Sequence, residues 1–313
     1  MGDKTINFLV IILIVIIMIY VVRETVKTIK YGISEFKIRI IKFKGRLNFK
    51  NSSYFKVTQL PYNIVKHNSG YYGEYLTYLY LKKFEDSGAK FLFNLYIPKG
   101  DNNTSEIDLL MVCSKGIFVF ESKNFSGWIF GDETRLMWYQ TLRVGYGESE
   151  KNEFYNPVMQ NKKHIEHLKS VLNITYPIQS IVVFSDRCSF KNIQLLSNER
   201  NVIHRYEVYK LITSICNQNS HFLLSKEEIE GIYATLYPYS QVNSKTKIEH
   251  SIKIKNDFTH QPDSLSIEKE YESISCPLCG GKLVLRTAKK GGHEGEQFYG
   301  CSNYPKCRYI KNI

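Results

Sequence analysis

The sequence predicts an α/β protein: one mixed sheet flanked by helices, followed by a small cysteine-rich module. Between residues 70 and 185 the hydrophobic periodicity changes in the order helix, strand, hairpin, strands, helix, strand, which is typical of the α/β class. Four of the seven cysteines lie in the last part of the chain, after a polar stretch without a clear period. With 313 residues and 43% hydrophobic content, the chain can bury a sizeable core and still carry appendages.

The first part of this domain is predicted to contain a helix followed by strands. Residues 70–84, GYYGEYLTYLYLKKF, have apolar side chains at three- and four-residue spacing, which predicts a helix. Residues 90–98, KFLFNLYIP, predict a strand that ends at its proline. After the hairpin, SGWIFG and RLMWYQTL predict two more strands around a Gly-Asp turn, and we expect Trp128 and Trp138 in these strands to be core residues.

The second part continues with a helix, a strand and two helices. Residues 156–172 predict a helix with Asn156 as N-cap and Pro157 in its first turn. The apolar segment IQSIVVFS predicts a buried strand. Residues 204–237 predict two further helices, the second of them capped by Ser225.

The hairpin within residues 106–124, EIDLLMVCSKGIFVFESKN, contains charged residues in two otherwise apolar strands. A two-residue turn pairs Cys113 with Gly116, and counting outward then places Asp108 opposite Glu121. Directly opposed side chains lie roughly 5 Å apart, where two carboxylates repel each other. A divalent cation would remove this repulsion.

Side-chain alternation places Lys123 on the same face of the strand as Glu121, whereas we expect Glu106 to point away from Asp108. An alternative turn of three residues would move the register by one position, so that Asp108 faces Ser122. In that case the charges would only mark solvated strand ends. The hairpin pattern by itself leaves both interpretations open.

The formal net charge of +12 suits either a polyanionic partner or an anionic membrane surface. Near the N-terminus, residues 6–22 include the unbroken apolar run FLVIILIVIIMIYVV, which predicts a transmembrane anchor. A cleaved signal peptide is the alternative, but only Lys4 supplies a basic start and no small-residue cleavage site follows. The basic segment after residue 22 predicts, by the positive-inside rule, that the rest of the chain faces the cytoplasm at the cell membrane, with a simple spacer as the other interpretation.

These signals divide the chain into six segments. We expect a transmembrane anchor, a basic juxtamembrane connector, a globular domain, a helical extension of that domain, a polar linker and a cysteine-rich module, at residues 6–22, 23–65, 66–185, 186–237, 238–272 and 273–313 respectively.

The spacing of the last four cysteines predicts a structural zinc site. A pair with two intervening residues, Cys276 and Cys279, and a second pair, Cys301 and Cys307, supply four thiolates for a tetrahedral ion. In a reducing cytoplasm such clustering favours metal over disulfides. A segment this short has little core, so the zinc would supply the missing stability.

The amino-acid sequence of this module, CPLCGGKLVLRTAKKGGHEGEQFYGCSNYPKCRYI, resembles the C-terminal zinc ribbon of bacterial type IA topoisomerases. The resemblance covers about residues 274–313 and implies binding of single-stranded DNA. Aromatic side chains that stack on bases and basic ones that meet phosphates are expected at Arg286, Lys289, Phe298, Tyr299, Tyr304, Lys306 and Arg308.

Residues 66–185 resemble the NERD (nuclease-related) domain, a branch of the PD-(D/E)xK nuclease superfamily, which implies a restriction-endonuclease-like fold and metal-dependent phosphodiesterase activity. The matching residues are Gly70, Gly73, Glu74, Glu106, Ile107, Asp108, Glu121, Ser122, Lys123, Asn124, Gly127, Trp138, Asn156, Pro157 and Gln160. One departure from the superfamily pattern is that Ile107 stands where the proline of "PD" would be.

The resemblance implies roles for five catalytic residues. Asp108 and Glu121 would hold Mg²⁺ or Mn²⁺, and Lys123 would position the attacking water or steady the developing negative charge. Glu74 would bind a second ion or orient water, and Gln160 would orient the lysine or the phosphate.

Structural alternatives exist for several of these positions. Glu74 could be an exposed acid at a helix N-terminus, and Gln160 could bond the surface of its own helix. His164 and His167 lack the spacing of a zinc-protease motif, so we expect a basic helix face there.

The sequence therefore predicts a membrane-anchored, Mg²⁺-dependent nuclease that acts on DNA and carries a DNA-binding zinc ribbon. A non-catalytic, membrane-tethered nucleic-acid-binding protein is the alternative, and RNA remains possible as the substrate.

Overall fold

The computed structural model describes residues 2–100, 103–145, 147–173, 178–196, 202–218 and 223–243, and, in the C-terminal module, residues 276, 278–279, 283–287 and 297–312. The chain divides into two compact units, residues 1–48 and 49–313.

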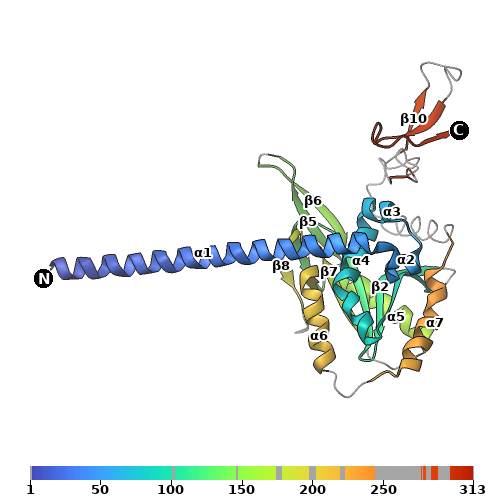
Figure 1. Cartoon of the computed structure of the whole chain (residues 1–313), viewed down its shortest axis with the longest axis horizontal. Coiled ribbons are helices and arrows are strands. Elements are labelled where there is room, and N and C mark those ends of the chain that lie inside the picture. The colour runs from blue at the N-terminus through green and yellow to red at the C-terminus, as the bar shows by residue number, and fades with distance from the viewer. Residues whose placement is uncertain are drawn as a thin grey trace. The chain divides into compact units, whose positions relative to one another are not determined.

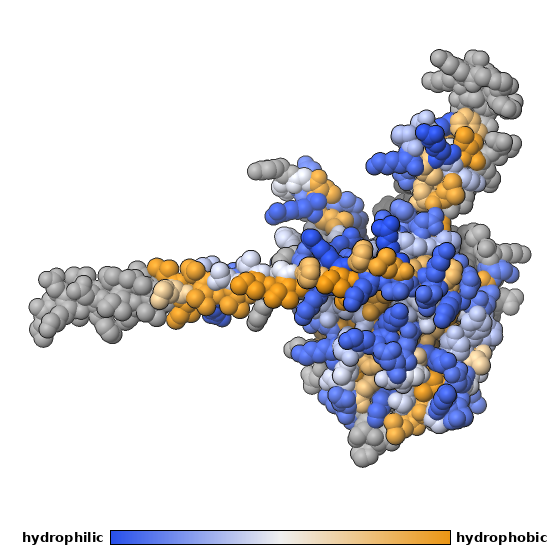
Figure 2. Space-filling model, in the orientation of Figure 1, coloured by the Kyte–Doolittle hydropathy of each residue, from blue (hydrophilic) through white to orange (hydrophobic). Residues whose placement is uncertain are grey.

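The first unit is one long helix, α1 (Gly2–Leu47), which ends in a basic turn with Lys44 and Arg46 (Figure 1). Each side chain from Ile16 to Val22 is more than half exposed, and Figure 2 shows these apolar residues as a continuous stretch. The side chains of residues 6–15, the first part of the predicted anchor, lie outside the described residues. Among the helices in the described part of the chain, none combines the length and the apolar character needed to cross a bilayer.

The second unit contains the predicted α/β domain and the cysteine-rich module. Its helices are α2 (Ser53–Thr58), α3 (Tyr62–His67), α4 (Ser69–Leu81), α5 (Pro157–Leu172), α6 (Val208–Gln218) and α7 (Lys226–Ser240), with short 3₁₀ turns at Phe49–Asn51, Lys82–Ser87 and Arg205–Glu207. Its strands are β1 (Lys90–Pro98), β2 (Thr104–Cys113), β3 (Gly116–Lys123), β4 (Gly127–Asp132), β5 (Met137–Arg143), β6 (Ser149–Tyr155), β7 (Ile178–Phe184), β8 (Cys188–Gln194), β9 (Val202–His204), β10 (Leu283–Thr287), β11 (Gln297–Cys301) and β12 (Ile310–Asn312).

The α/β domain is built on two mixed sheets. The larger sheet has the strand order β1-β2-β3-β7-β9; β1, β2 and β3 are antiparallel neighbours, and β7 and β9 run parallel to β3. The smaller sheet has the order β6-β5-β4-β8 and is also mixed, because β8 runs parallel to β4. The prediction of a mixed α/β architecture is confirmed, although the strands form two sheets.

Helices α4 and α5 cover opposite faces of the larger sheet, as the end of β3 shows. Ser122 contacts Thr77 of α4 through their hydroxyl oxygens, 3.3 Å apart, whereas the flanking Lys123 bonds Gln160 of α5. Adjacent residues of a strand point to opposite faces, so the two helices lie on either side of β3. The core between these layers is almost entirely apolar, as in Leu110, Phe118 and Ile181, which are fully buried.

The hairpin register follows the two-residue turn. Cys113 pairs with Gly116, and the ladder between β2 and β3 runs outward as far as Leu109 and Phe120. The alternative with a three-residue loop is therefore wrong. In its place, the tight turn at Ser114 and Lys115 fixes which side chains of β3 face α5.

Two glycines of the nuclease-related pattern allow backbones to approach closely. A Cβ on Gly73 of α4 would lie 2.8 Å from the Cβ of Asn124, so glycine lets this helix pack against the end of β3. Gly127, at the start of β4, has φ of +76°, and a Cβ there would lie 2.4 Å from the carbonyl oxygen of Thr141.

Asn156 explains the Asn-Pro pair at the start of α5. Its Oδ1 accepts hydrogen bonds from the backbone of Val158 and Met159, as an N-cap does. Its Nδ2 donates to the carbonyl oxygens of Asp132, Glu133 and Arg135, at 3.3, 3.0 and 2.7 Å. A single side chain therefore ties the helix start to the turn between β4 and β5.

The structure differs from the expected one at one tryptophan and in the segment of residues 186–237. Trp138 is fully buried and stacks on Phe184, as expected of a core residue, but Trp128 is 43% exposed, so its assignment to the core was wrong. The segment expected to be a helical extension contains β8 and β9 as well as α6 and α7. Residues 244–272 of the predicted linker lie outside the described residues.

Candidate active site

The candidate site forms where β2 and β3 separate. Beyond the last ladder pair, the Asp108 side chain accepts a hydrogen bond from the Ser122 backbone N–H at 2.8 Å. Beyond the ladder, this side-chain hydrogen bond to Asp108 takes the place of a further backbone hydrogen bond between β2 and β3. This puts the Asp108 carboxylate against the segment of β3 that carries Glu121 and Lys123.

Lys123 lies at the centre of the hydrogen-bonded cluster. Its Nζ lies 2.6 Å from Glu121 Oε1 and 3.0 Å from Gln160 Oε1. The Lys123 side chain is 18% exposed and that of Glu121 is 2% exposed, so an ammonium and a carboxylate are held together close to the surface. Gln160 bonds the lysine and not the surface of its own helix, so its structural alternative is wrong.

The electrostatics of this pair favour the charged forms. Burial works against ionisation of Glu121, but the charge of Lys123 and the neighbouring His164 lower the pKa of Glu121 below its ordinary value. Burial likewise works against charge on Lys123, yet the carboxylates of Glu121 and Asp108 raise the pKa of its ammonium. Lys123 therefore stays protonated at neutral pH and acts as a hydrogen-bond donor there.

The pKa values of Asp108 and Glu74 are raised, in contrast to that of Glu121. Burial raises the pKa of Asp108, and the charge of Glu121 raises it further, against the pull of Lys123 and the Ser122 N–H. Burial also raises the pKa of Glu74, followed by the charges of Asp108 and Glu106. Carboxylates that repel each other in this way are stabilised by a cation.

Glu74 lies apart from the lysine cluster. It is buried in α4, where its Oε2 accepts a hydrogen bond from the Tyr54 hydroxyl at 3.4 Å. The alternative of an exposed helix acid is therefore wrong. Within the described residues Glu74 has no contact with Lys123, and the charge of Asp108 is its link to the site.

Glu106 was expected to point away from Asp108, and this was wrong. Residues two apart in a strand share a face. Both side chains are half-buried, flanked by the buried Ser105 and Ile107, and Glu106 contributes to the raised pKa of Asp108. Its own Oε1 accepts a hydrogen bond from Tyr96 at 2.6 Å.

Two polar residues of the site were missed in the sequence. His164, expected on a basic helix face, is buried, with Nδ1 2.6 Å from Ser105 Oγ and Nε2 3.3 Å from Glu121 Oε2. Asn94 is buried in β1 with φ of +51°, and it favours the ionised form of Glu74. A single Asn in the apolar strand KFLFNLYIP was the available signal for the second residue, but none pointed to the first.

The carboxylates fit a hard divalent cation. The Oε2 atom of Glu121 is buried and has no hydrogen-bond partner of good geometry, its polar neighbour being His164 Nε2 at 3.3 Å, so this oxygen could also serve as a ligand. Asp108 uses Oδ2 for the Ser122 N–H, which leaves Oδ1 on the same carboxylate. Carboxylate oxygens completed by water and phosphate are the surroundings that Mg²⁺ prefers.

The cysteine cluster is a separate, closed site. The Sγ atoms of Cys276, Cys279, Cys301 and Cys307 all lie within 4.8 Å of one another, and in the described part of the chain no other group of three or more candidate ligands comes this close. Four thiolates leave no open position, so this geometry fits structural zinc. Glu74 does not join Asp108 and Glu121 in a group of that kind.

The predicted DNA-binding residues of this module differ in exposure. Tyr304 is 61% exposed, and Arg286, Lys306 and Arg308 are also exposed. Tyr299 packs partly against the cysteine cluster. Phe298 is half-buried, and Lys289 lies outside the described residues. Tyr304 is therefore the most exposed of the three predicted aromatic side chains.

Comparisons with known proteins agree with this division of the chain. Residues 69–185 match the family model of the nuclease-related domain (NERD), and residues 273–313 match that of the topoisomerase DNA-binding C4 zinc finger. The chain thus joins a domain of nuclease-related type to a zinc ribbon of topoisomerase type, and the latter supports DNA binding.

Individual relatives match different parts of the chain. An uncharacterized protein of Bacillus anthracis is 28% identical over 189 residues, which cover 60% of this chain and 85% of that protein. DNA topoisomerase 1 of Helicobacter pylori is 49% identical over 88 residues, or 28% of this chain and 11% of the topoisomerase. DNA topoisomerase 1 of Methanocaldococcus jannaschii is 47% identical over 47 residues, or 15% and 6%. The chain therefore spans only a small part of these topoisomerases. No solved structure matches it significantly.

Proposed function

We propose that the chain is a metal-dependent nuclease that hydrolyses DNA phosphodiester bonds. The observation that carries this proposal is the Lys123 ammonium, 2.6 Å from Glu121 and 3.0 Å from Gln160, beside the carboxylate of Asp108. A purely structural scaffold has no need for a nearly buried ammonium among carboxylates, because burying charges costs several kcal/mol per ion. In phosphodiester hydrolysis an ammonium in this position opposes the charge that develops on the phosphate.

Each residue has a distinct role in this proposal. Asp108 and Glu121 would hold Mg²⁺ or Mn²⁺, and such an ion would polarise the scissile phosphate and lower the pKa of a water. Lys123 donates hydrogen bonds to that water or to the phosphate oxygens. Gln160 fixes the ammonium through Oε1. Glu74, linked to Asp108 by charge, tunes this carboxylate from the α4 side.

The zinc ribbon holds DNA, single-stranded or distorted, through stacking on Tyr304 and contacts from Arg286, Lys306 and Arg308. The exposure of these side chains supports the proposal. Base stacking on an aromatic ring tolerates any sequence, which suits a nuclease without sequence preference.

The proposal also places the protein at a membrane. The exposed apolar side chains Ile16–Val22, followed by basic residues, support an anchor with the catalytic domain in the cytoplasm. Nuclease activity would then be confined to DNA that reaches the membrane surface.

The test follows nicking of plasmid and single-stranded DNA by the full chain, purified in detergent with its zinc retained. We expect cleavage to need Mg²⁺ or Mn²⁺ and to fall by about 10²-fold or more in Lys123→Ala. The matched control is Lys162→Ala, because Lys162 is an exposed lysine of α5. Far-UV circular dichroism would check that both variants are folded.

Two results would contradict the proposal. If wild type and Lys123→Ala bind DNA equally and neither cuts it with any divalent metal, the protein is a non-catalytic nucleic-acid-binding tether. If RNA is cut and DNA is not, the substrate assignment is wrong.

A further inference from the structure

The smaller sheet has one face packed in the core and one face open to solvent. Ile129 of β4 and Trp138 of β5 are fully buried in the inner face. The opposite side, here called the outer sheet face, is formed by alternating residues of β4 and β5 and by one lysine each from β6 and β8: Trp128, Phe130, Tyr139, Thr141, Arg143, Lys151 and Lys191. The proposed site residues all come from the larger sheet and its helices, so this face has no role in the chemistry described so far.

Aromatic rings on this face are arranged in a row. Phe130 and Tyr139 pair across β4 and β5 and stack with centroids 4.8 Å apart and planes inclined by 9°. Trp128 is two residues before Phe130 on the same strand and is 43% exposed. An exposed tryptophan next to a stacked aromatic pair has a large apolar surface available for binding.

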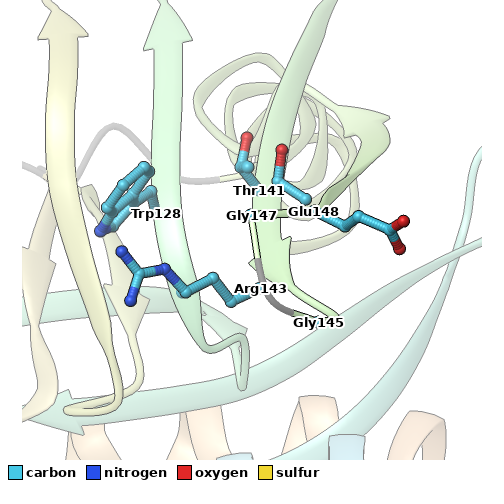
Figure 3. A pocket seen from close by; sticks show the side chains of 8 residues that line it. Trp128, Thr141, Arg143, Gly145, Gly147 and Glu148 are labelled. Carbon is cyan, nitrogen blue, oxygen red and sulfur yellow. The ribbon is translucent and has the colours of Figure 1, made fainter.

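A hollow of about 830 Å³ adjoins Trp128 and is also lined by Thr141, Arg143 and Glu148. Figure 3 shows the Trp128 ring and the Arg143 guanidinium next to each other on one side of this hollow, while the Glu148 carboxylate points away from them. A planar ring and a guanidinium side by side match a base and its phosphate.

Cations accompany the exposed rings. Lys191 Nζ lies 5.0 Å from the Trp128 ring centroid, and Lys151 Nζ lies 4.2 Å from that of Tyr139. Lys151 also lies 3.5 Å from Glu153. Arg143 and Lys191, in contrast, form no ion pair with any carboxylate in the described part of the chain. The surroundings of Trp128 are therefore positively charged.

We propose that the outer sheet face binds single-stranded nucleic acid, with a base stacked on Trp128 and phosphates held by Arg143 and Lys191. Exposed rings that alternate with cations complement a strand of bases and phosphates, and within the described residues neither Arg143 nor Lys191 is paired to a carboxylate. The inference deepens the proposed function, because it rests on a nucleic acid being the substrate.

The chain connects this face with the candidate active site. Trp128 is five residues after Lys123, so their Cα atoms lie at most about 17 Å apart. Between them, the exposed Arg187 donates a hydrogen bond to the carbonyl oxygen of Asn124 at 2.8 Å. A strand bound at Trp128 thus passes a further cation on the way to Lys123.

The test uses the two tryptophans of the chain as reporters. Oligo(dT) of about 16 nucleotides is titrated into the full chain in detergent, without Mg²⁺ or Mn²⁺, and binding is followed by anisotropy of a label on the oligonucleotide. We expect tryptophan emission to be quenched on binding and the quench to disappear in Trp128→Phe, which keeps an aromatic ring. Trp128→Ala should weaken binding about five- to 150-fold.

Matched variants distinguish the contribution of this face to DNA binding from the contributions of overall positive charge and of the zinc ribbon. Arg143→Gln should weaken binding several-fold, whereas Lys226→Gln, which removes an exposed cation on α7, should not. Tyr304→Ala should lower the affinity without removing the quench, since it changes only the ribbon.

The outcomes distinguish this inference from the proposed nuclease activity. If oligo(dT) binds but the emission of Trp128 does not change and Trp128→Ala binds within twofold of wild type, the outer sheet face is not a nucleic-acid site, even if cleavage occurs. If the quench and the loss in Trp128→Ala are both found while no metal supports cleavage, the inference stands and the catalytic proposal fails.

Discussion

In the motif formed by Asn156, Pro157 and Gln160, we expect Asn156 to stabilise the fold and Gln160 to serve the chemistry. Replacing Asn156 tests the first of these roles. In the structure its Oδ1 caps α5, and its Nδ2 contacts three carbonyl oxygens of the β4–β5 turn. Losing an N-cap costs about 1 kcal/mol. Nδ2 has two hydrogens, so its contacts count as at most two full bonds, worth about 1–3 kcal/mol together. Asn156→Ala should therefore destabilise the domain by about 2–4 kcal/mol, a large part of a typical total of about 5–15 kcal/mol.

The substitution Asn156→Asp refines this prediction. Aspartate keeps the acceptor that caps the helix but replaces the amide donor by a carboxylate oxygen facing three carbonyls. We expect Asn156→Asp to be at least as destabilised as Asn156→Ala at pH 7, despite being an excellent N-cap. Gln160→Ala should instead lose cleavage while its stability changes little, because it bonds only Lys123 among the described residues.

The assay is urea unfolding followed by tryptophan emission and circular dichroism. Trp138 is a suitable reporter, since it is buried and its Nε1 donates to the same Asp132 carbonyl that Asn156 contacts. Asn152→Ala, on the adjacent strand β6, is the control, because Asn152 makes no side-chain hydrogen bond within the described residues. The reasoning is refuted if Asn156→Asp unfolds within about 0.5 kcal/mol of wild type.

Three further predictions concern the site and the ribbon. His164→Ala should lower cleavage about 10- to 100-fold and raise the Mg²⁺ concentration needed, because the residue orients Glu121; His167→Ala is the control, and equal rates in both would contradict the role. Burial and then the charge of Asp108 raise the pKa of Glu74 above its ordinary 4.5, so ionisation of this group lowers stability as the pH rises beyond that value. Glu74→Gln should therefore gain urea resistance relative to wild type at pH 8 and little at pH 5, and an equal gain at both pH values would show that the carboxyl charge is not the cause. A zinc chelator should release one zinc per chain and weaken DNA binding without moving the unfolding midpoint reported by Trp138, whereas a shifted midpoint would mean that the ribbon supports the α/β domain.

Local patterns in the sequence were sufficient for much of the fold. The Asn-Pro pair predicted the start of α5, because a helix cap depends on few residues. The polar turn at Ser114 and Lys115 predicted the hairpin but left two registers open, of which the structure has the one that pairs Cys113 with Gly116. The division of the strands between two sheets could not be predicted in this way. It depends on β7 pairing with β3 and β8 pairing with β4, and parallel pairs between distant segments leave no local signal.

In the candidate site, too, local patterns predicted some residues, whereas contacts between distant segments could not be predicted. Glu121 and Lys123 were predictable because period-two alternation puts them on one face. His164 was missed because helical spacing predicts which face of a helix a residue lies on, but not which side chain of another element it will contact. Here that side chain is the buried carboxylate of Glu121. Trp128 was assigned to the core because tryptophans usually are buried, yet its strand has only one face against the core.

The two-residue turn between β2 and β3 also has a consequence for how the site assembles during folding. Closing so short a loop costs little chain entropy, so the ends of this hairpin meet early, before distant strands pair. Its outer ends bring together two carboxylates, whose repulsion would slow the zipping of the last pairs. Lys123, two positions beyond Glu121 on the same strand, arrives with them and opposes that repulsion at once. The proposed catalytic lysine is thus also the counter-charge that allows the hairpin to close without waiting for a metal ion or for a cation from elsewhere in the chain.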